Sequence, residues 1–242
     1  MIDRINTCEN DDEKTNLTEL LDLLTPVIKA WPSEYGPKAN DLGIQVLGGA
    51  GYTREYLAEQ FWRDNRLNPI HEGTNGIQAL DLTFRKLWQN NSLGLQTLQR
   101  EIGRDLAQVS QGGDTLPQSR KLADKLMIYL DQLPKLVMQI GQEINTSPQK
   151  ALALTGNAAA MMSVFATLIV SWMWLRQALT AETLLNDLDH SNDNTEEIRH
   201  FYQGKLQAAK YFMDWELPLI ERDLALLRQS NEVVTEMQAE WF

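Results

Sequence analysis

The sequence predicts an all-α protein, made of part of a four-helix bundle followed by a second helical unit. Apolar residues recur at three- and four-residue steps along most of the 242 residues, which is the spacing of amphipathic helices. Proline and glycine stand where this spacing stops and restarts, as expected at helix ends. No segment alternates apolar and polar residues convincingly, so we expect no sheet.

The first helical segment follows a polar start. Residues 1–16 are polar and acidic and lack the apolar core of a signal peptide, so we expect a flexible N-terminus. From Leu17 to Ile28, apolar residues recur at helical steps. Pro26 and Pro32 interrupt this region, which is therefore either two short helices or one kinked helix. Helical spacing then resumes and stops at Gly48.

Two shorter helices are expected to complete a first domain over 17–92. The first covers about 54–62. The second begins at Thr74, because threonine is a good N-cap. Its apolar residues fall on one side of the helix. They are Ile77, Leu80, Phe84 and Leu87.

Residues 93–242 are expected to form an appended helical domain. Its helices are separated by breaks rich in glycine, proline or polar residues. They begin at about Gly94, Pro117, Pro148 and Glu196. Both prolines suit the first position of a helix, where the missing N–H costs nothing. We expect the last helix to reach about Glu232, with a kink at Pro218.

The composition argues against several kinds of site. The formal net charge of −11 argues against a broad basic face for nucleic acid, because neutralising phosphates requires clustered Lys and Arg. The single cysteine, Cys8, cannot form an internal disulfide and has no metal-ligand spacing. We therefore expect no metal site, and a reducing, cytoplasmic compartment is the simplest interpretation.

An uncharged stretch from Ala151 to Leu175 is long enough to cross a bilayer. It contains several hydroxyl and amide side chains, and its most apolar part, from Met161 to Leu175, is shorter than a full span. A helix buried on all sides between other helices explains the same composition. We expect this buried helix and no membrane span.

Two short segments carry possible chemistry. Glu72 directly precedes Gly73 and the helix start at Thr74, and a desolvated carboxylate can remove a proton. Free N–H groups at a helix start suit a phosphate or a developing oxyanion. A surface loop capped by Thr74 also explains these residues, since capping sequences are common. The turn that begins at Gly48 is a second candidate for phosphate contact, although helices often end in glycine.

The two segments together resemble the C-terminal helical domain of the acyl-CoA dehydrogenases. The resemblance covers about Leu17 to Leu87. It is carried by Gln45-x-x-Gly48-Gly49-x-Gly51-Tyr52 and by Glu72-Gly73-Thr74-x-x-Ile77-Gln78. The longer string from Arg63 to Gln78 resembles a large bacterial branch whose members carry an extra C-terminal helical domain. Residues 93–242 would be that domain.

The resemblance implies an FAD cofactor, an acyl-CoA substrate and a named role for five residues. Glu72 matches the base that takes the α-proton of the thioester while the β-hydrogen leaves as hydride to FAD. Gln45, Gly48 and Gly49 match residues that contact the adenosine-diphosphate part of FAD in a neighbouring subunit. Thr74 matches a residue beside the cofactor's phosphates or sugar. A homo-oligomer, or a complementing chain with the flavin-binding domain, is therefore expected.

Two functions remain open on the sequence alone. Members of this family begin with a helical domain and a β-barrel domain, and we expect neither in this chain. The chain is then the C-terminal part of an acyl-CoA dehydrogenase, inactive when isolated. The alternative is a catalytically inactive helical interaction module, with Trp172, Trp174 and Trp215 burying a partner surface. Core packing also explains these tryptophans.

Overall fold

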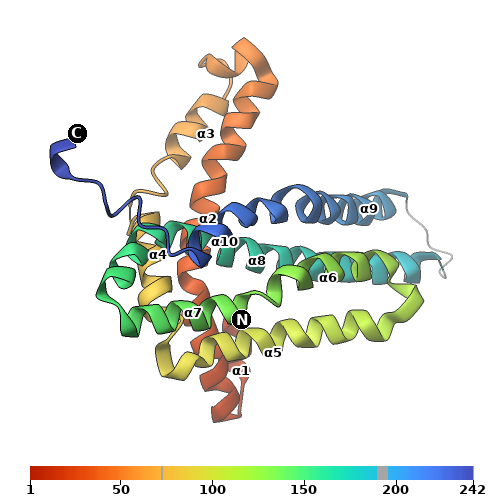
Figure 1. Cartoon of the computed structure of the whole chain (residues 1–242). Coiled ribbons are helices and arrows are strands. Elements are labelled where there is room, and N and C mark those ends of the chain that lie inside the picture. Colours follow the sequence, from red (N-terminus) through yellow and green to blue (C-terminus); the bar gives the residue numbers. More distant parts are fainter. Residues whose placement is uncertain (72, 190–195, 242) are drawn as a thin grey trace. The chain divides into compact units, whose positions relative to one another are not determined.

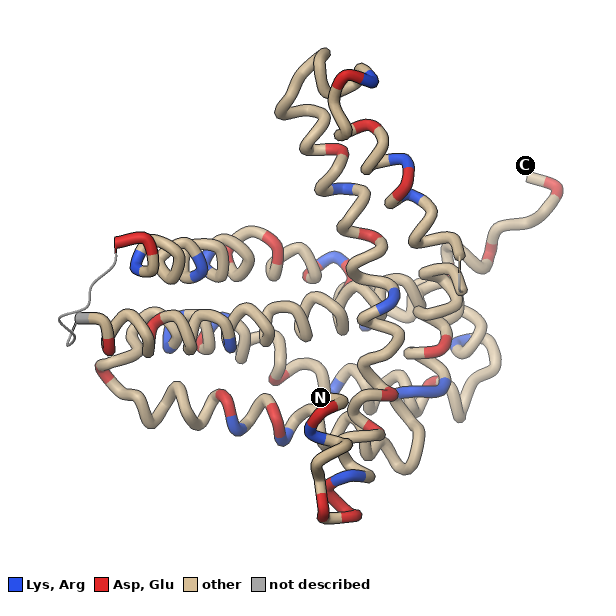
Figure 2. Tube along the Cα trace, turned by 180° about the vertical axis from the view of Figure 1, so that it is seen from behind, with Lys and Arg blue, Asp and Glu red and all other residues tan. Residues whose placement is uncertain are grey.

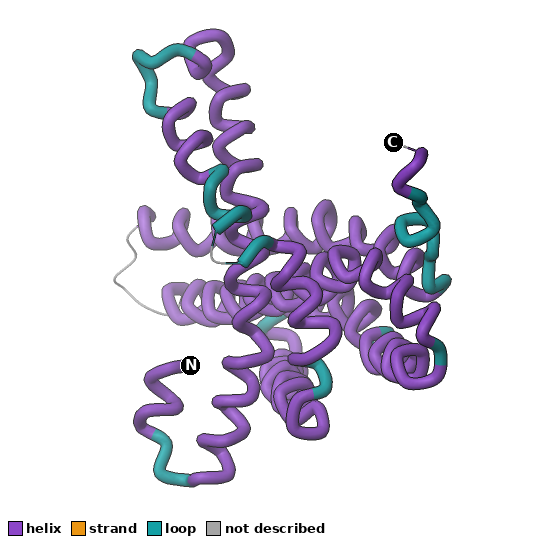
Figure 3. Tube along the Cα trace, turned by 90° about the vertical axis from the view of Figure 1, so that its left-hand side faces the viewer, coloured by secondary structure: helices purple, strands orange, loops and turns teal. Residues whose placement is uncertain are grey.

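The computed structural model describes residues 1–71, 73–189 and 196–241. These residues contain helices, turns and loops but no strand, so the predicted all-α class is confirmed (Figures 1 and 3). The chain divides into two compact units, Met1–Thr97 and Leu98–Phe242. Lys, Arg, Asp and Glu are interspersed along the trace of both units (Figure 2), and no run of basic residues stands out.

The first unit begins with a short helix and a long one. Its helices are α1 (Ile2–Thr7), α2 (Asp11–Leu47), α3 (Ala58–Asn65), α4 (Asn75–Asp81) and the start of α5 (Gln89–Gly112). Much of 1–16 is therefore helical, where we expected a flexible segment. The Asn10 side chain accepts a hydrogen bond from the Glu13 N–H (2.8 Å), which caps α2. The acidic first turn of α2 adds a favourable interaction with the helix dipole.

Helix α2 continues through 37 residues and contains Pro26, Pro32 and Pro37. The alternative of two short helices in this region is therefore wrong. Each interior proline disfavours a helix by about 3 kcal/mol. Burial against neighbouring helices has to offset this cost, because local propensity cannot. Leu17, Leu20, Leu23 and further apolar side chains of α2 are buried.

The buried side of α4 differs from the expected one. Ile77 is 58% exposed and Leu80 is 39% exposed, whereas Ala79 and Leu82 are buried. The expected position of Leu87 in the core is confirmed. A π-helical turn at Leu82–Lys86 follows α4 and changes the helical register, which a regular 3.6-residue pattern does not anticipate.

A buried lysine lies at the end of this π-helical turn. The Lys86 ammonium forms an ion pair with Asp22 on α2, and its side chain is 6% exposed. The hydrogen bond from Lys86 holds the pKa of the Asp22 carboxyl below its ordinary value. A buried ammonium needs such a partner, and Asp22 supplies it.

The second unit is organised around α8. Its further helices are α6 (Pro117–Leu130), α7 (Leu133–Thr146), α8 (Pro148–Asp189), α9 (Glu196–Tyr211) and α10 (Ile220–Arg228). The predicted starts at Pro117 and Pro148 are confirmed. The last helix ends earlier than expected, at Arg228. A π-helical turn and a 3-10 turn at Phe212–Leu219 separate α9 from α10, and Pro218, where we expected a kink, lies in the 3-10 turn.

Helix α8 packs against α6, α7, α9 and α10 (Figure 1). By length and composition alone, Pro148–Leu188 could cross a membrane, but 67% of its apolar window is buried inside the protein. Phe165 and Leu175 have no exposed surface. Trp172 is 3% exposed, and its indole N–H donates to Asp105 on α5 (2.6 Å). This helix is therefore the core of its unit, which is the expected reading of the uncharged stretch.

The segment after α10 lies against α8. The Asn157 side chain donates to the backbone carbonyl of Asn231 (2.6 Å). A Cβ added at Gly156 would lie 3.1 Å from the Cβ of Val234, which is a tight contact, so a side chain at this position would press on this segment. The glycine in the middle of this helix thus lies where the side chains of Val234 and Thr235 come close to α8.

Glu143 on α7 also holds this segment. Its carboxylate accepts from the Ser230 hydroxyl (2.5 Å) and the Gln139 amide (2.9 Å), and Lys150 lies 3.4 Å away. Burial raises the pKa of Glu143, but the hydrogen bonds and the Lys150 charge outweigh burial and lower it below 4.5. The ionised carboxylate therefore stabilises the fold.

We expect the stabilisation by Glu143 to disappear in acid. It is fully present above the unfolded pKa, near 4.5, and is lost as the pH falls through the lower folded pKa. Urea unfolding of the wild type and Glu143→Gln from pH 7 to pH ~3 measures it. The difference in free energy of unfolding should shrink below about pH 4.5. A difference that does not vary with pH would contradict this role.

Candidate functional site

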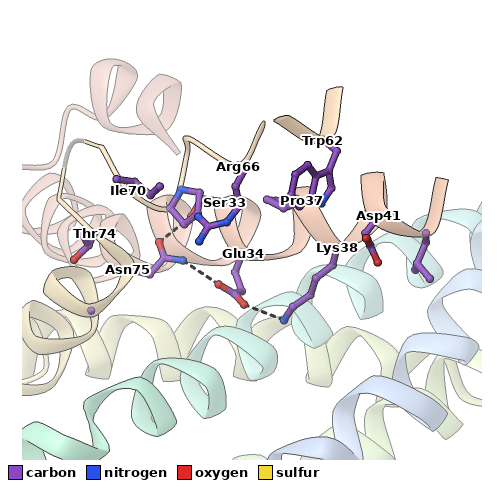
Figure 4. Close-up of a pocket in the computed structure, with 13 residues that line it drawn as sticks. Ser33, Glu34, Pro37, Lys38, Asp41, Trp62, Arg66, Ile70, Thr74 and Asn75 are labelled. Atoms are coloured by element: carbon purple, nitrogen blue, oxygen red, sulfur yellow. Dashed lines mark hydrogen bonds and ion pairs between the residues drawn. The ribbon is translucent and has the colours of Figure 1, made fainter. Parts of the chain in front are cut away.

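A pocket of about 670 Å³ lies in the first unit, lined by α2, α3 and the start of α4 (Figure 4). Trp62 of α3 and Arg66, directly after α3, form part of its wall, and Lys38 of α2 contributes an ammonium group. An indole ring beside a guanidinium and an ammonium suits a ligand that combines a flat ring with phosphate. Glu34 and Asp41 line the same pocket and limit its positive charge.

Thr74 and its helix form the inner end of this pocket. The Thr74 hydroxyl accepts a hydrogen bond from the Ile77 N–H (3.4 Å), so the predicted N-cap is confirmed. Gly73 has φ +88°, a conformation that glycine adopts without strain. It lines a smaller pocket of about 240 Å³ together with His71 and Ser33. Glu72, the expected base, lies outside the described residues.

Sequence reasoning missed the contacts that join α2 to the start of α4 in this site. The Ser33 hydroxyl donates to Asn75 Oδ1 (2.8 Å), and Asn75 Nδ2 donates to Glu34 Oε2 (3.3 Å). Glu34 also pairs with Lys38 (3.1 Å). The contacts to Asn75 join residues 42 and 41 positions apart, so no local pattern could indicate them.

The expected cofactor-binding residues at the end of α2 lie elsewhere. Gln45, Gly48 and Gly49 are exposed, and none of them lines the pocket at Thr74. Gly48 has φ +59°, and its N–H donates to the Gln45 carbonyl, which ends α2. In Figure 1 this turn stands at the outer end of the α2–α3 pair, away from α4. The structure thus places Thr74 apart from the other three.

Apolar side chains are exposed around this turn. Val46 and Tyr52 are 86% and 82% exposed, and Leu57 and Phe61 of the returning segment are 60% and 54% exposed. Exposed apolar surface of this extent marks an interaction site more often than a free surface. We call residues 42–62 the arm.

The described residues do not favour a metal site. Among them, no group of three or more His, Cys, Asp or Glu side chains could hold a metal ion. Within the pocket, Glu34 pairs with Lys38 and accepts a hydrogen bond from Asn75. The site consists of the helix cap at Thr74, the turn at Gly73 and a pocket lined by side chains of both charges.

Both units match known families. Residues 7–86 match the family described as acyl-CoA dehydrogenase, C-terminal domain, and residues 98–238 match that described as acetyl-CoA dehydrogenase C-terminal like. The chain is 29% identical, over 89% of its length, to a broad-specificity linear acyl-CoA dehydrogenase of Mycobacterium tuberculosis, of which it covers 34%. It is 28% identical, over 84% of its length, to a 3-methylmercaptopropionyl-CoA dehydrogenase of Ruegeria pomeroyi, of which it covers 32%. The chain thus spans about a third of the length of these relatives.

Proposed function

Because this chain belongs to the acyl-CoA dehydrogenase family, we propose that it forms the C-terminal part of an FAD-dependent acyl-CoA dehydrogenase. The reaction is the α,β-dehydrogenation of an acyl-CoA thioester. The observation that carries the proposal is that two family matches follow one another along the chain and fall on its two compact units.

In this proposal Glu72 is the base that takes the α-proton of the thioester. FAD, when bound, supplies the acceptor for the hydride that leaves the β-carbon. Gly73, with its positive φ, leaves the backbone beside Glu72 open to a ligand. The Glu72 N–H would help to hold the thioester oxygen and so acidify the α-carbon. The neighbouring residue Thr74 fixes the start of α4 through its cap and would lie beside the cofactor's phosphates or sugar.

Gln45, Gly48 and Gly49 would contact the adenosine-diphosphate part of FAD held by another subunit. The geometry of the turn fits this role, because a Cβ built on either glycine meets nothing within 4 Å and the backbone is open to solvent. The exposed apolar residues of the arm support this proposal, because a second chain would cover them. The second chain is either another copy of this protein or a different chain that carries the flavin-binding domain. We place this assembly in the cytoplasm.

Flavin retention tests the proposal. We expect the purified chain alone to be colourless and to leave acyl-CoA unoxidised. Co-expression with the flavin-binding portion of the enzyme should give a yellow complex that oxidises acyl-CoA. Normal turnover by the isolated chain, supplied only with FAD and acyl-CoA, would disprove its dependence on that portion. A colourless, inactive complex would disprove the enzymatic proposal itself.

The second candidate is a catalytically inactive helical interaction module. Trp215 supports it, because this side chain is 69% exposed and stacks on Tyr211, with ring centroids 5.9 Å apart. Trp172 does not support it, since that residue is buried in the core. A complex that binds flavin without oxidising any acyl-CoA would favour the module.

A further inference from the structure

Asn75 is the first residue of α4, and its side chain forms hydrogen bonds with two residues of α2 (Figure 4). Ser33 is only 7% exposed, and its hydroxyl lies 2.8 Å from Asn75 Oδ1 and 2.9 Å from the Ala30 carbonyl oxygen, so these two acceptors share its one hydrogen. On the other side of the amide, Asn75 Nδ2 donates to Glu34 Oε2 (3.3 Å). Two consecutive residues of α2 therefore hold both ends of one amide group.

The charge on Glu34 determines which way this amide faces. An ionised carboxylate accepts hydrogen bonds but cannot donate them, so the amide nitrogen has to face Glu34 and the amide oxygen has to face Ser33. The Lys38 ammonium pairs with the same carboxylate at 3.1 Å. The arrangement therefore accepts asparagine at position 75 and disfavours aspartate.

We infer that Ser33 and Glu34 are positioning residues that act through Asn75. By fixing Asn75 they hold the start of α4, and with it Thr74 and Gly76 in the pocket wall. The consequence for catalysis rests on the function proposed above, in which Glu72 is the base three positions before Asn75. A shifted start of α4 then misplaces the base and lowers kcat more than it raises KM.

The variant Asn75→Asp separates this role from ordinary helix stabilisation. An acidic residue in the first turn of a helix is normally favourable, because it interacts with the positive end of the helix dipole. Beside Glu34, however, the new carboxylate meets a like charge and loses the donated hydrogen bond. Adding Glu34→Gln removes the repulsion and supplies an amide donor, so the double variant should recover.

Hydrogen exchange in the purified chain is the first measurement. In Asn75→Asp, we expect the backbone amides of Ile77 and Gln78 to exchange about five- to ten-fold faster, the effect of losing about one hydrogen bond. The double variant should exchange at the wild-type rate. Glu34→Gln alone should also stay close to wild type, because the glutamine carbonyl can still accept the hydrogen bond from Asn75 Nδ2 and the exposed pair with Lys38 contributes little. Asp41→Asn is the matched control, since Asp41 lines the same pocket without contacting Asn75.

Steady-state kinetics of the flavin-loaded complex is the second measurement. In Asn75→Asp, kcat should fall roughly ten- to hundred-fold, with KM changing much less, and the double variant should restore kcat. Wild-type exchange in Asn75→Asp, or no recovery in the double variant, would overturn the positioning role. If the amides of Asn75→Asp exchange faster as expected but kcat is unchanged, Asn75 has no part in catalysis. If the amides of Asn75→Asp exchange faster as expected but the wild-type complex is inactive, the proposed function is rejected and the positioning role remains.

Discussion

Glu72→Gln is expected to abolish acyl-CoA oxidation in the flavin-loaded complex while leaving FAD bound. Glutamine has the size of glutamate but cannot take the α-proton at neutral pH. A positioned general base contributes roughly 10²- to 10⁴-fold to a rate, so kcat should fall by about this factor. Dye reduction measures kcat, and the flavin absorbance of the same sample measures bound cofactor.

A second carboxylate variant controls for charge. Glu59 lies on α3 and pairs with Arg63 (3.1 Å), and Glu59→Gln removes the same charge elsewhere in the same unit. We expect that variant to keep most of its activity. Retained activity in Glu72→Gln would remove Glu72 from the role of base. If Glu72→Gln loses its flavin, the result would indicate that Glu72 has a structural role.

Phe165→Ala is expected to produce the largest loss of stability among simple substitutions in the second unit. Phe165 has no exposed surface and lies in the middle of α8. Truncating a buried phenylalanine to alanine leaves a cavity and costs about 3–5 kcal/mol. Urea unfolding in buffer without detergent should show this loss in the free energy of unfolding.

Leu152→Ala is the matched control on the same helix. Leu152 is 57% exposed, and a surface substitution of this kind usually changes stability by less than about 0.5 kcal/mol. If both variants were as stable as the wild type, α8 would not be the core of its unit. A requirement for detergent to keep the wild type in solution would revive the membrane-spanning alternative for Pro148–Leu188.

The sequence predicted those parts of the fold that depend on local chemistry. Helix starts at Pro117 and Pro148 follow from the missing proline N–H, and the cap at Thr74 follows from a hydroxyl beside free N–H groups. The end of α2 at Gly48 follows from a backbone conformation that glycine adopts readily. These features require only residues that are close together in the chain.

The sequence did not predict features that depend on distant partners. The unbroken α2 is one, because propensity alone favours breaks at its prolines. The inward position of Lys86 is another, since its ammonium pairs with Asp22 on α2. The pairing of Ser33 with Asn75 belongs here too, because α2 and α4 have to pack before the two side chains meet.

The three prolines of α2 also affect how stiff that helix is. In a regular helix each N–H donates to the carbonyl four residues earlier, so Pro26, Pro32 and Pro37 leave the carbonyls of Asp22, Ile28 and Ser33 without that donor. Bending at these points breaks no further main-chain hydrogen bond. The outer part of α2 can therefore adjust its direction to a neighbouring surface while its helical turns stay intact.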